Sequence, residues 1–225
     1  MKFKMAELAG QIFNRTFERE IECKNGTLRI QQAEVGDESC VVWDAALVLA
    51  KYIQTDHFCS TDGLVNRRVI ELGAGTGVVG LIAAASGAHV CCTDLPTVVP
   101  LIESNRQINQ HLITGSFTAN SLEWGQDVST FQPTPDIILV ADCIYYEESL
   151  FPLVVTLCDL SDANTTVLIC YEERTTGNKP LLEKKFHELV REHFTVKEIP
   201  EEHQDPVYHS PDIHLLRLTK KDVKL

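Results

Sequence analysis

The sequence predicts an α/β fold in which helices cover both faces of a mostly parallel, seven-stranded sheet. Three features support this prediction. From Arg68 onward, short apolar runs alternate with helix-like segments; a glycine-rich turn joins the first run to its helix; and no helix separates the last two strand-like runs. Alternating strands and helices favour parallel pairing, and the missing crossover helix favours an antiparallel hairpin at the end of the chain.

The N-terminal part predicts a separate β-hairpin. The runs FEREIEC (17–23) and TLRIQQ (27–32) flank an Asn25-Gly26 pair. Asn-Gly between strand-like runs is a strong signal for a tight hairpin turn.

A helix is expected next, within CVVWDAALVLAKYI (40–53), which is rich in alanine and leucine. Asp44 is expected to cap it, because short polar side chains accept hydrogen bonds from the first helical N–H groups. The polar residues 54–66 are expected to form a loop.

Four strand-helix units follow, and their residues can be read from the hydrophobic pattern. The strands are expected at 68–72, 89–94, 136–142 and 165–173, and the helices at 78–86, before Asn109, at 148–158 and at 180–194. A weaker strand is expected within 116–124, and the terminal antiparallel strands at 195–199 and 212–218.

The chain contains no repeat, low-complexity tract or linker. We therefore expect one domain over residues 1–225, with an N-terminal extension and hairpin over 1–39 and the core over 40–225.

Composition and charge argue against several classes of function. The chain is 44% hydrophobic and 23% charged, as in soluble globular proteins, and no apolar run is long enough to span a membrane. The N-terminus carries Glu7 and lacks the apolar region of a signal peptide, so we expect a cytoplasmic protein without a membrane partner. A net charge of −12 weighs against nucleic-acid binding. The eight cysteines form no C-x-x-C pair, so we expect reduced core thiols and no metal site.

The stretch IELGAGTGVVGL fits two nucleotide-binding patterns. Gly75, Gly77 and Gly80 match the dinucleotide fingerprint G-x-G-x-x-G. In the other register, Glu71 precedes Gly73, Gly75 and Gly77. A carboxylate beside a turn that receives a pyrophosphate is disfavoured by Coulomb repulsion, whereas S-adenosylmethionine carries a cationic sulfonium and an ammonium. The sequence therefore predicts an S-adenosylmethionine site in which Glu71 faces positive charge.

Other residues suit a nucleoside without discriminating between cofactors. Asp94 ends the second strand of the units, and a carboxylate about 20 residues beyond a glycine turn can accept hydrogen bonds from ribose hydroxyls. Trp43 and Trp124 lie next to turns and offer flat walls for adenine, although core packing is the commoner fate of tryptophan. A tight turn without a ligand would also explain the glycines, but it rarely needs so many beside two acidic strand ends.

The acceptor side of the site is predicted after the strand at 136–142. That strand brings Asp142 to the carboxyl edge of the sheet, followed by Tyr145 and Tyr146. Methyl transfer needs an unprotonated lone pair aligned behind the methyl group, so positioning can supply much of the catalysis. Asp142 can accept a hydrogen bond from an incoming amine, and Tyr145 can orient it. Alternatively, Asp142 caps the next helix and the tyrosines pack in the core.

The strand at 165–173 brings more polar residues to the same edge. Tyr171, Glu172 and Arg174 lie at or just beyond its end. We assign Tyr171 and Glu172, together with Tyr146, to substrate binding. Surface ion pairing explains Glu172 and Arg174 equally well.

With these residues in place, the chain resembles the seven-β-strand protein lysine methyltransferases of the methyltransferase-like group, over roughly residues 17–219. The segments that carry the resemblance are CVVWDAA (40–46), ELGAGTG (71–77), TDL (93–95), HLITGS (111–116), ADCIYYEESL (141–150), YEERT (171–175) and DIH (212–214). The resemblance implies a Rossmann-like class I methyltransferase sheet with S-adenosyl-L-methionine as cofactor. It implies acceptor handling by Asp142 and Tyr145, and cofactor contacts from Trp43, Gly73, Ala74, Gly75, Asp94, Trp124 and Ala141.

We therefore interpret the chain as an S-adenosylmethionine-dependent protein-lysine N-methyltransferase. The resemblance is strongest to members that methylate a lysine of valosin-containing protein, an AAA ATPase, and it implies that substrate. We expect the enzyme to be a monomer. The alternatives are a small-molecule amine or O-methyltransferase, a non-enzymatic binding protein that keeps the cofactor fold, and an NAD-dependent dehydrogenase. A metal-dependent O-methyltransferase would need further acidic ligands around Asp142. Glu71 and the terminal hairpin disfavour the dehydrogenase.

Overall fold

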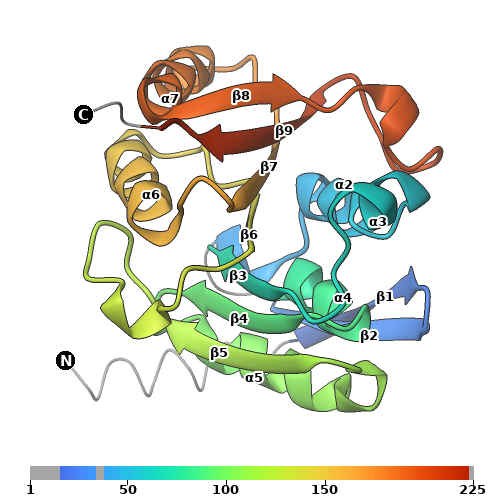
Figure 1. Cartoon of the computed structure of the whole chain (residues 1–225). Helices are drawn as coiled ribbons and strands as arrows, with labels where there is room; N and C mark the ends of the chain where they lie inside the picture. The colour runs from blue at the N-terminus through green and yellow to red at the C-terminus, as the bar shows by residue number, and fades with distance from the viewer. Residues whose placement is uncertain (1–15, 34–37, 223–225) are drawn as a thin grey trace.

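The central sheet has the strand order β5-β4-β3-β6-β7-β9-β8 (Figure 1). The computed structural model describes residues 16–33 and 38–222. The parallel strands are β3 (Arg68–Leu72), β4 (His89–Asp94), β5 (Ser116–Ser121), β6 (Ile137–Ala141) and β7 (Thr166–Glu172). β9 (Ile213–Lys220) is antiparallel to both β7 and β8 (Phe194–Glu198). The predicted seven-stranded, mostly parallel sheet with a terminal antiparallel hairpin is confirmed.

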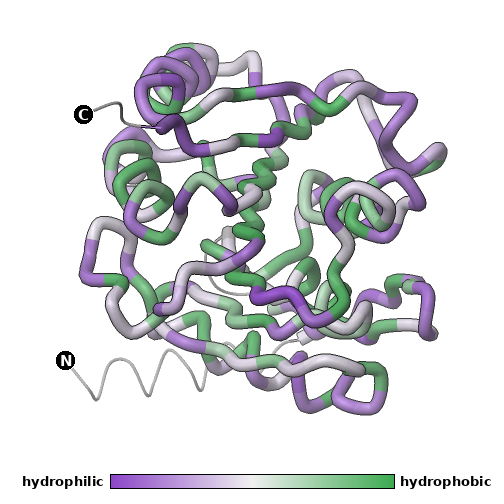
Figure 2. The backbone as a smooth tube through the Cα atoms, viewed as in Figure 1, coloured by the Kyte–Doolittle hydropathy of each residue, from purple (hydrophilic) through white to green (hydrophobic). Residues whose placement is uncertain are grey.

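Helices cover both faces of this sheet, as the alternating pattern predicts. The helices are α2 (Asp44–Tyr52), α4 (Val78–Ala85), α5 (Val99–Ile108), α6 (Glu147–Leu160) and α7 (Lys179–His193). Alternate strand residues enter two cores: Val69 packs with residues of α2 and α4, whereas Ile70 packs with residues of α6 and α7. Figure 2 shows hydrophobic residues concentrated along the central strands and polar residues along the peripheral loops.

The N-terminal hairpin is confirmed and is fastened to α5 by side chains. β1 (Thr16–Cys23) pairs antiparallel with β2 (Gly26–Ala33). The Arg29 N–H donates to Asn109 Oδ1 (2.8 Å), and the Arg29 carbonyl accepts from Asn109 Nδ2 (2.8 Å). Asn105, one turn earlier, makes the same pair of bonds with Gln31 (2.7 and 3.0 Å). Two fully buried asparagine amides thus take the place of a neighbouring strand at the edge of β2.

The hairpin also supports the segment that leads into α2. Gln32 is 3% exposed, and its Oε1 accepts a hydrogen bond from the Val42 N–H at 2.8 Å. Because Trp43 follows directly, this bond holds the start of α2 in place beside the carboxyl edge of the sheet.

Two local predictions are wrong. Asp44 does not cap α2: Trp43 occupies the cap position with extended backbone (φ −85°, ψ 156°), and Asp44 is the first helical residue, where its charge suits the helix dipole. The expected loop at 54–66 contains a short helix, α3 (Asp56–Thr61), because the Thr55 hydroxyl accepts a hydrogen bond from the Phe58 N–H at 3.2 Å. Fully buried Phe58 anchors this helix.

The cysteine prediction holds only in part. All eight cysteines are thiols, and four of them, Cys40, Cys92, Cys143 and Cys170, are buried. Cys23, Cys91 and Cys158 are partly buried, and Cys59 on α3 is exposed, so the expectation that all are core residues is wrong.

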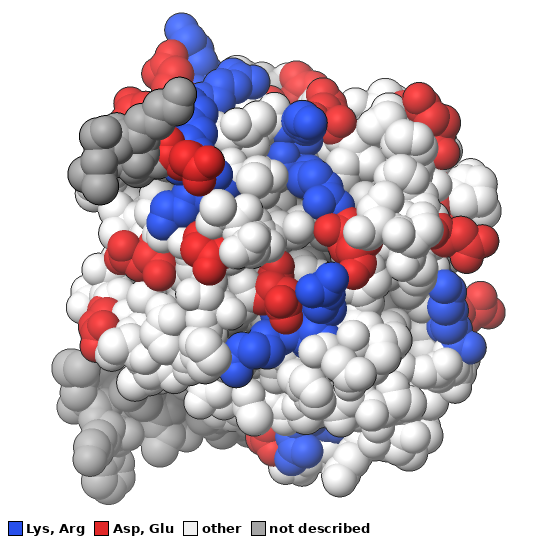
Figure 3. All heavy atoms as spheres, in the orientation of Figure 1, with Lys and Arg blue, Asp and Glu red and all other residues white. Residues whose placement is uncertain are grey.

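None of the described helices is long and apolar, and the face drawn in Figure 3 carries both acidic and basic side chains. None of the helices within 16–33 and 38–222 has the length and apolar character that crossing a membrane requires. On the face drawn in Figure 3, acidic and basic side chains are interspersed rather than gathered by sign.

Close packing of α4 on the sheet depends on Gly80. A Cβ at this position would lie 2.2 Å from Cys92 Sγ and 2.6 Å from Glu71 Oε2. The Gly80 N–H also donates to Glu71 Oε2 at 2.8 Å. The missing side chain therefore lets the first turn of α4 approach β3 and β4 closely.

We expect Gly80→Ala to lower the free energy of unfolding by about 1–3 kcal/mol, because the added methyl overlaps Cys92 and Glu71. Urea denaturation measures this loss. In a Cys92→Ala background the same substitution is expected to cost at least about 0.5 kcal/mol less, since one of the two overlaps is gone. An equal cost in both backgrounds would contradict this packing account.

Candidate active site

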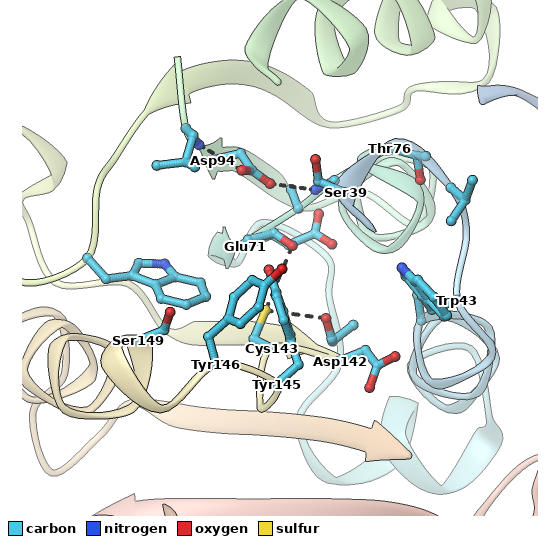
Figure 4. Close-up of a pocket in the computed structure, with 18 of the residues that line it drawn as sticks. Ser39, Trp43, Glu71, Thr76, Asp94, Asp142, Cys143, Tyr145, Tyr146 and Ser149 are labelled. Atoms are coloured by element: carbon cyan, nitrogen blue, oxygen red, sulfur yellow. Dashed lines mark hydrogen bonds between the residues drawn. The ribbon is translucent and has the colours of Figure 1, made fainter. Parts of the chain in front are cut away.

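A cavity of about 500 Å³ opens at the carboxyl ends of β3, β4 and β6, where open α/β sheets bind ligands. It gathers most of the residues singled out from the sequence: Trp43, Glu71, Gly73, Ala74, Gly75, Asp94, Trp124, Ala141, Asp142, Tyr145 and Tyr146. Figure 4 shows the rings of Tyr145 and Tyr146 side by side in the cavity, with the Trp43 indole across from them. Because β3 lies between β4 and β6, Glu71 lies between Asp94 and Asp142.

The floor of the cavity is the turn from β3 to α4. Gly73 and Gly75 have φ values of 61° and 56°, which side-chain-bearing residues rarely adopt. A Cβ on Gly73 would lie 2.7 Å from Cys143 Sγ and 2.9 Å from Trp124 Cζ2, and one on Gly75 would lie 2.8 Å from the Ser39 carbonyl oxygen. The loop therefore presents bare backbone to the cavity, as a tightly held nucleoside cofactor requires.

Asp94 holds this turn against β4. Its Oδ2 accepts a hydrogen bond from the Gly75 N–H at 2.8 Å, and its Oδ1 accepts one from the Leu95 N–H at 2.7 Å. The residue is 8% exposed and lines the cavity. Since each carboxylate oxygen has more than one acceptor site, Asp94 can take ribose hydroxyls while it keeps these backbone bonds.

Glu71 is more deeply placed than the sequence suggests. The residue is 2% exposed, and its Oε2 accepts from the Gly80 N–H (2.8 Å) and the Cys92 thiol (3.0 Å). Burial raises the pKa of Glu71 to about 7, against the lowering effect of these two donors. Its negative charge is therefore only partly developed near neutral pH, and a cation in the cavity would favour the ionised form.

Asp142 follows β6 in an uncommon backbone conformation. Its φ is 53°, and its N–H donates to the Cys170 carbonyl on β7 at 2.8 Å. Aspartate tolerates the left-handed region better than most residues, and such conformations concentrate at functional sites. The side chain is 8% exposed. It does not cap α6, whose cap position is Tyr146, so the capping alternative for Asp142 is wrong.

The carboxylate of Asp142 is paired with Arg174. Arg174 Nη2 lies 2.8 Å from Asp142 Oδ2, and the Glu172 N–H lies 3.4 Å from Asp142 Oδ1. The Arg174 guanidinium also sits over the Trp43 ring, with 5.1 Å between Cζ and the ring centroid. Arg174 thus links the Asp142 carboxylate to one wall of the cavity through an ion pair and a cation–π contact.

The two tyrosines form the side of the cavity opposite Trp43. Their ring centroids are 4.6 Å apart, and Tyr146 is 43% exposed. Lys179, at the start of α7, donates from Nζ to the Tyr145 carbonyl at 2.6 Å. Its Nζ lies 5.9 Å from the centroid of the Tyr146 ring, so a second cation borders this end of the cavity.

Three residues assigned from the sequence do not line the cavity. Gly77 shapes the turn as the cap residue of α4, with φ 76°. Tyr171 is 3% exposed and faces α7, where its hydroxyl bonds to Glu183 (3.0 Å) and His187 (2.9 Å). Glu172 is exposed and lies 3.7 Å from Arg174. The substrate-binding role assigned to Tyr171 is therefore withdrawn, because β7 directs this side chain to the other face of the sheet.

Residues that received no role from the sequence also reach the cavity. Ser39, Cys143 and Lys179 line it, and Arg174 is more than a surface ion pair. For Arg174 the available signal was its place two residues beyond β7, at the same edge as Asp142. Among residues 16–33 and 38–222, no three histidine, cysteine, aspartate or glutamate side chains gather into a metal-binding group.

Known lysine methyltransferases are similar to this chain in sequence. The family described as "Lysine methyltransferase" matches residues 22–192. Protein N-lysine methyltransferase METTL21A of Mus musculus is 34% identical over 206 residues, which cover 88% of this chain and 85% of that protein. EEF1A lysine methyltransferase 3 of Mus musculus is 36% identical over 154 residues, which cover 68% of this chain and 62% of that protein.

Solved structures share the fold at low identity. The T. thermophilus 16S rRNA N2 G1207 methyltransferase RsmC, in complex with AdoMet and guanosine, has a TM-score of 0.60 at 18% identity, covering 92% of this chain and 51% of that chain. Magnesium protoporphyrin IX methyltransferase of Synechocystis PCC 6803, with bound SAH, has a TM-score of 0.56 at 14% identity, covering 79% of this chain and 84% of that chain. Identities this low show a shared fold and no more.

The raised pKa of Glu71 predicts that the protein releases protons when it binds S-adenosylmethionine. With a pKa of about 7, the carboxyl is about half protonated at pH 7, and a cationic ligand lowers that pKa. Wild-type protein is therefore expected to release up to about half a proton more on binding than Glu71→Gln, which keeps an acceptor for the Gly80 N–H. Calorimetry at pH 7 in two buffers of different ionisation enthalpy measures the release. Equal release by both proteins would contradict the prediction.

Proposed function

Because the chain belongs to the lysine methyltransferase family, it is an S-adenosylmethionine-dependent protein-lysine methyltransferase, and we propose that its substrate is a lysine of valosin-containing protein. Two of the segments that resemble the members acting on this AAA ATPase, ADCIYYEESL and YEERT, supply the acceptor end of the cavity. The first contributes Asp142, Tyr145 and Tyr146, and the second contributes Arg174. The segments that carry the resemblance thus line the end of the cavity that would receive the lysine, and this supports the proposed substrate.

The residues present fit the cofactor. When bound, S-adenosylmethionine supplies a methyl group on a cationic sulfur. We propose that the bare backbone of Gly73 and Gly75 approaches it closely, and that Asp94 accepts hydrogen bonds from its ribose hydroxyls. Glu71 is the buried carboxylate that faces its positive charge. Ala74, Ala141, Trp43 and Trp124 complete the proposed cofactor contacts as parts of the cavity wall.

Asp142 and Tyr145 are the proposed catalytic residues, and the observation that carries this assignment is the buried carboxylate of Asp142 at positive φ. The carboxylate can accept a hydrogen bond from the acceptor amine, which fixes the direction of the nitrogen lone pair. Tyr145 and Tyr146 provide aromatic walls for the aliphatic stem of the lysine. Catalysis in this account is orientation and exclusion of water, with no metal ion taking part.

We further propose that the enzyme acts as a monomer in the cytoplasm, with a protein substrate and no nucleic-acid or membrane partner. A reducing compartment suits its eight thiols. The net charge of −12 and the mixed charges of Figure 3 do not suit a polyanionic partner.

Asp142→Asn is expected to lower the methyl-transfer rate by about 10²-fold or more, because the amide cannot replace the carboxylate as acceptor on both oxygens. Asparagine also tolerates positive φ, so the backbone and S-adenosylmethionine affinity are expected to be retained. Transfer of labelled methyl groups and calorimetry measure the two quantities. Asp136→Asn, which removes a carboxylate preceding β6 at the opposite edge of the sheet, is the matched control. Equal transfer by Asp142→Asn and wild type would refute the catalytic role.

Mass spectrometry of purified valosin-containing protein tests the proposed substrate. Incubation with this enzyme and S-adenosylmethionine is expected to add one or more methyl groups to a single lysine, because a lysine reaches the cavity only from a protein surface that fits around its mouth. The Asp142→Asn protein serves as the control for background methylation. Valosin-containing protein that stays unmodified while other proteins of a cell extract are methylated would contradict this substrate.

A further inference from the structure

The ion pair between Asp142 and Arg174 lies where the acceptor amine must arrive. The Asp142 side chain is 8% exposed and that of Arg174 is 31% exposed, with 2.8 Å between Oδ2 and Nη2. The same guanidinium stacks on Trp43 and lies 3.7 Å from Glu172 Oε2. Arg174 is therefore held from three sides, and both it and Asp142 line the cavity.

A carboxylate alone would be a poor neighbour for a reacting lysine. Lysine has a pKa of about 10.4 in water, so the ammonium predominates near neutral pH, and it has no lone pair to react. An opposite charge within a few ångströms raises such a pKa by about 1–3 units. An uncompensated Asp142 would thus orient the amine and at the same time keep it protonated.

We propose that Arg174 is a positioning residue that fixes the Asp142 carboxylate and offsets its charge, so that the acceptor lysine reacts as a free amine. The inference rests on the proposed function. The ammonium gives its proton to water before reaction, and the amine N–H donates to Asp142. The nitrogen lone pair then forms the bond to the methyl carbon as the carbon–sulfur bond breaks, leaving its electron pair on sulfur. The methylated ammonium that results loses a proton to water.

Other charged groups around this pair shift the equilibrium between the amine and the ammonium of the acceptor lysine, some in each direction. Lys179 on α7 lies beside Tyr145 and, like Arg174, favours the neutral amine. Carboxylates that border the cavity or Arg174 favour the ammonium; they come from β3, β4, α6 and β7 and are Glu71, Asp94, Glu148 and Glu172. Burial raises the pKa of the Cys143 and Cys170 thiols beside Asp142, so these thiols are neutral. Arg174 is the cation in direct contact with Asp142. Its removal is therefore expected to change the amine–ammonium equilibrium of the acceptor lysine most.

The pH dependence of kcat separates this role from a purely structural one, because kcat reports groups that titrate in the enzyme–substrate complex. Arg174→Met and Arg174→Gln, which both remove the charge, are expected to shift the midpoint of the rise in kcat to higher pH by about 1 unit or more. Arg174→Lys keeps the charge without the planar fork; it is expected to be slower than wild type but to keep the wild-type midpoint. Arg67→Met is the matched control, because it breaks an arginine–aspartate pair (3.5 Å) at the opposite edge of the sheet.

Methyl transfer from labelled S-adenosylmethionine is measured between about pH 6.5 and 10.5 on two acceptors, purified valosin-containing protein and the total protein of a cell extract. The second acceptor distinguishes a wrong substrate from a wrong role for Arg174. Urea denaturation of every variant confirms that it is folded. An alkaline shift confined to Arg174→Met and Arg174→Gln supports the inference. A uniform loss of rate with an unshifted midpoint in both variants overturns it. Labelling of extract proteins alone, with the same shift, would contradict valosin-containing protein as substrate and leave the role of Arg174 supported.

Discussion

The adjacency of β4, β3 and β6 is the constraint on which the site depends. Each of these parallel strands ends in or next to a carboxylate, and strand order alone places Asp94, Glu71 and Asp142 around one cavity. Carboxylates so close together would repel each other if they were unsupported. Each has its own donors instead: backbone N–H groups for Asp94, the Gly80 N–H and a thiol for Glu71, and a guanidinium for Asp142. The result is a cavity of negative character over bare backbone, which suits a cationic sulfur and not a diphosphate.

Elements outside the sheet keep the walls of this cavity in place. Asn105 and Asn109 bind β2 through four hydrogen bonds, and Gln32 at the end of β2 holds the backbone just before Trp43. Trp43 in turn carries Arg174 on its ring. The N-terminal hairpin is therefore connected to the Asp142 carboxylate through a short series of contacts, although it adds no strand to the central sheet.

Much of this could be predicted from the sequence, because strand-helix alternation and glycine spacing are local signals. The sheet, its terminal hairpin and the residues at the ends of β3, β4 and β6 follow from them. What could not be predicted depends on which elements become neighbours. Tyr171 and Cys170 are adjacent in β7 and face opposite cores, so assigning Tyr171 required the position of α7. Predicting the ion pair of Arg174 required knowing that β6 and β7 are adjacent. The short helix α3 could not be predicted because most of its residues are polar.

The central claim is that buried carboxylates beside a glycine turn select positive charge over diphosphate. Calorimetric titration of the same protein sample with S-adenosylmethionine and, separately, with NAD+ tests this claim directly. We expect heat of binding with S-adenosylmethionine and none with NAD+ at millimolar concentration. Binding of NAD+ by a protein that does not bind S-adenosylmethionine would contradict the account.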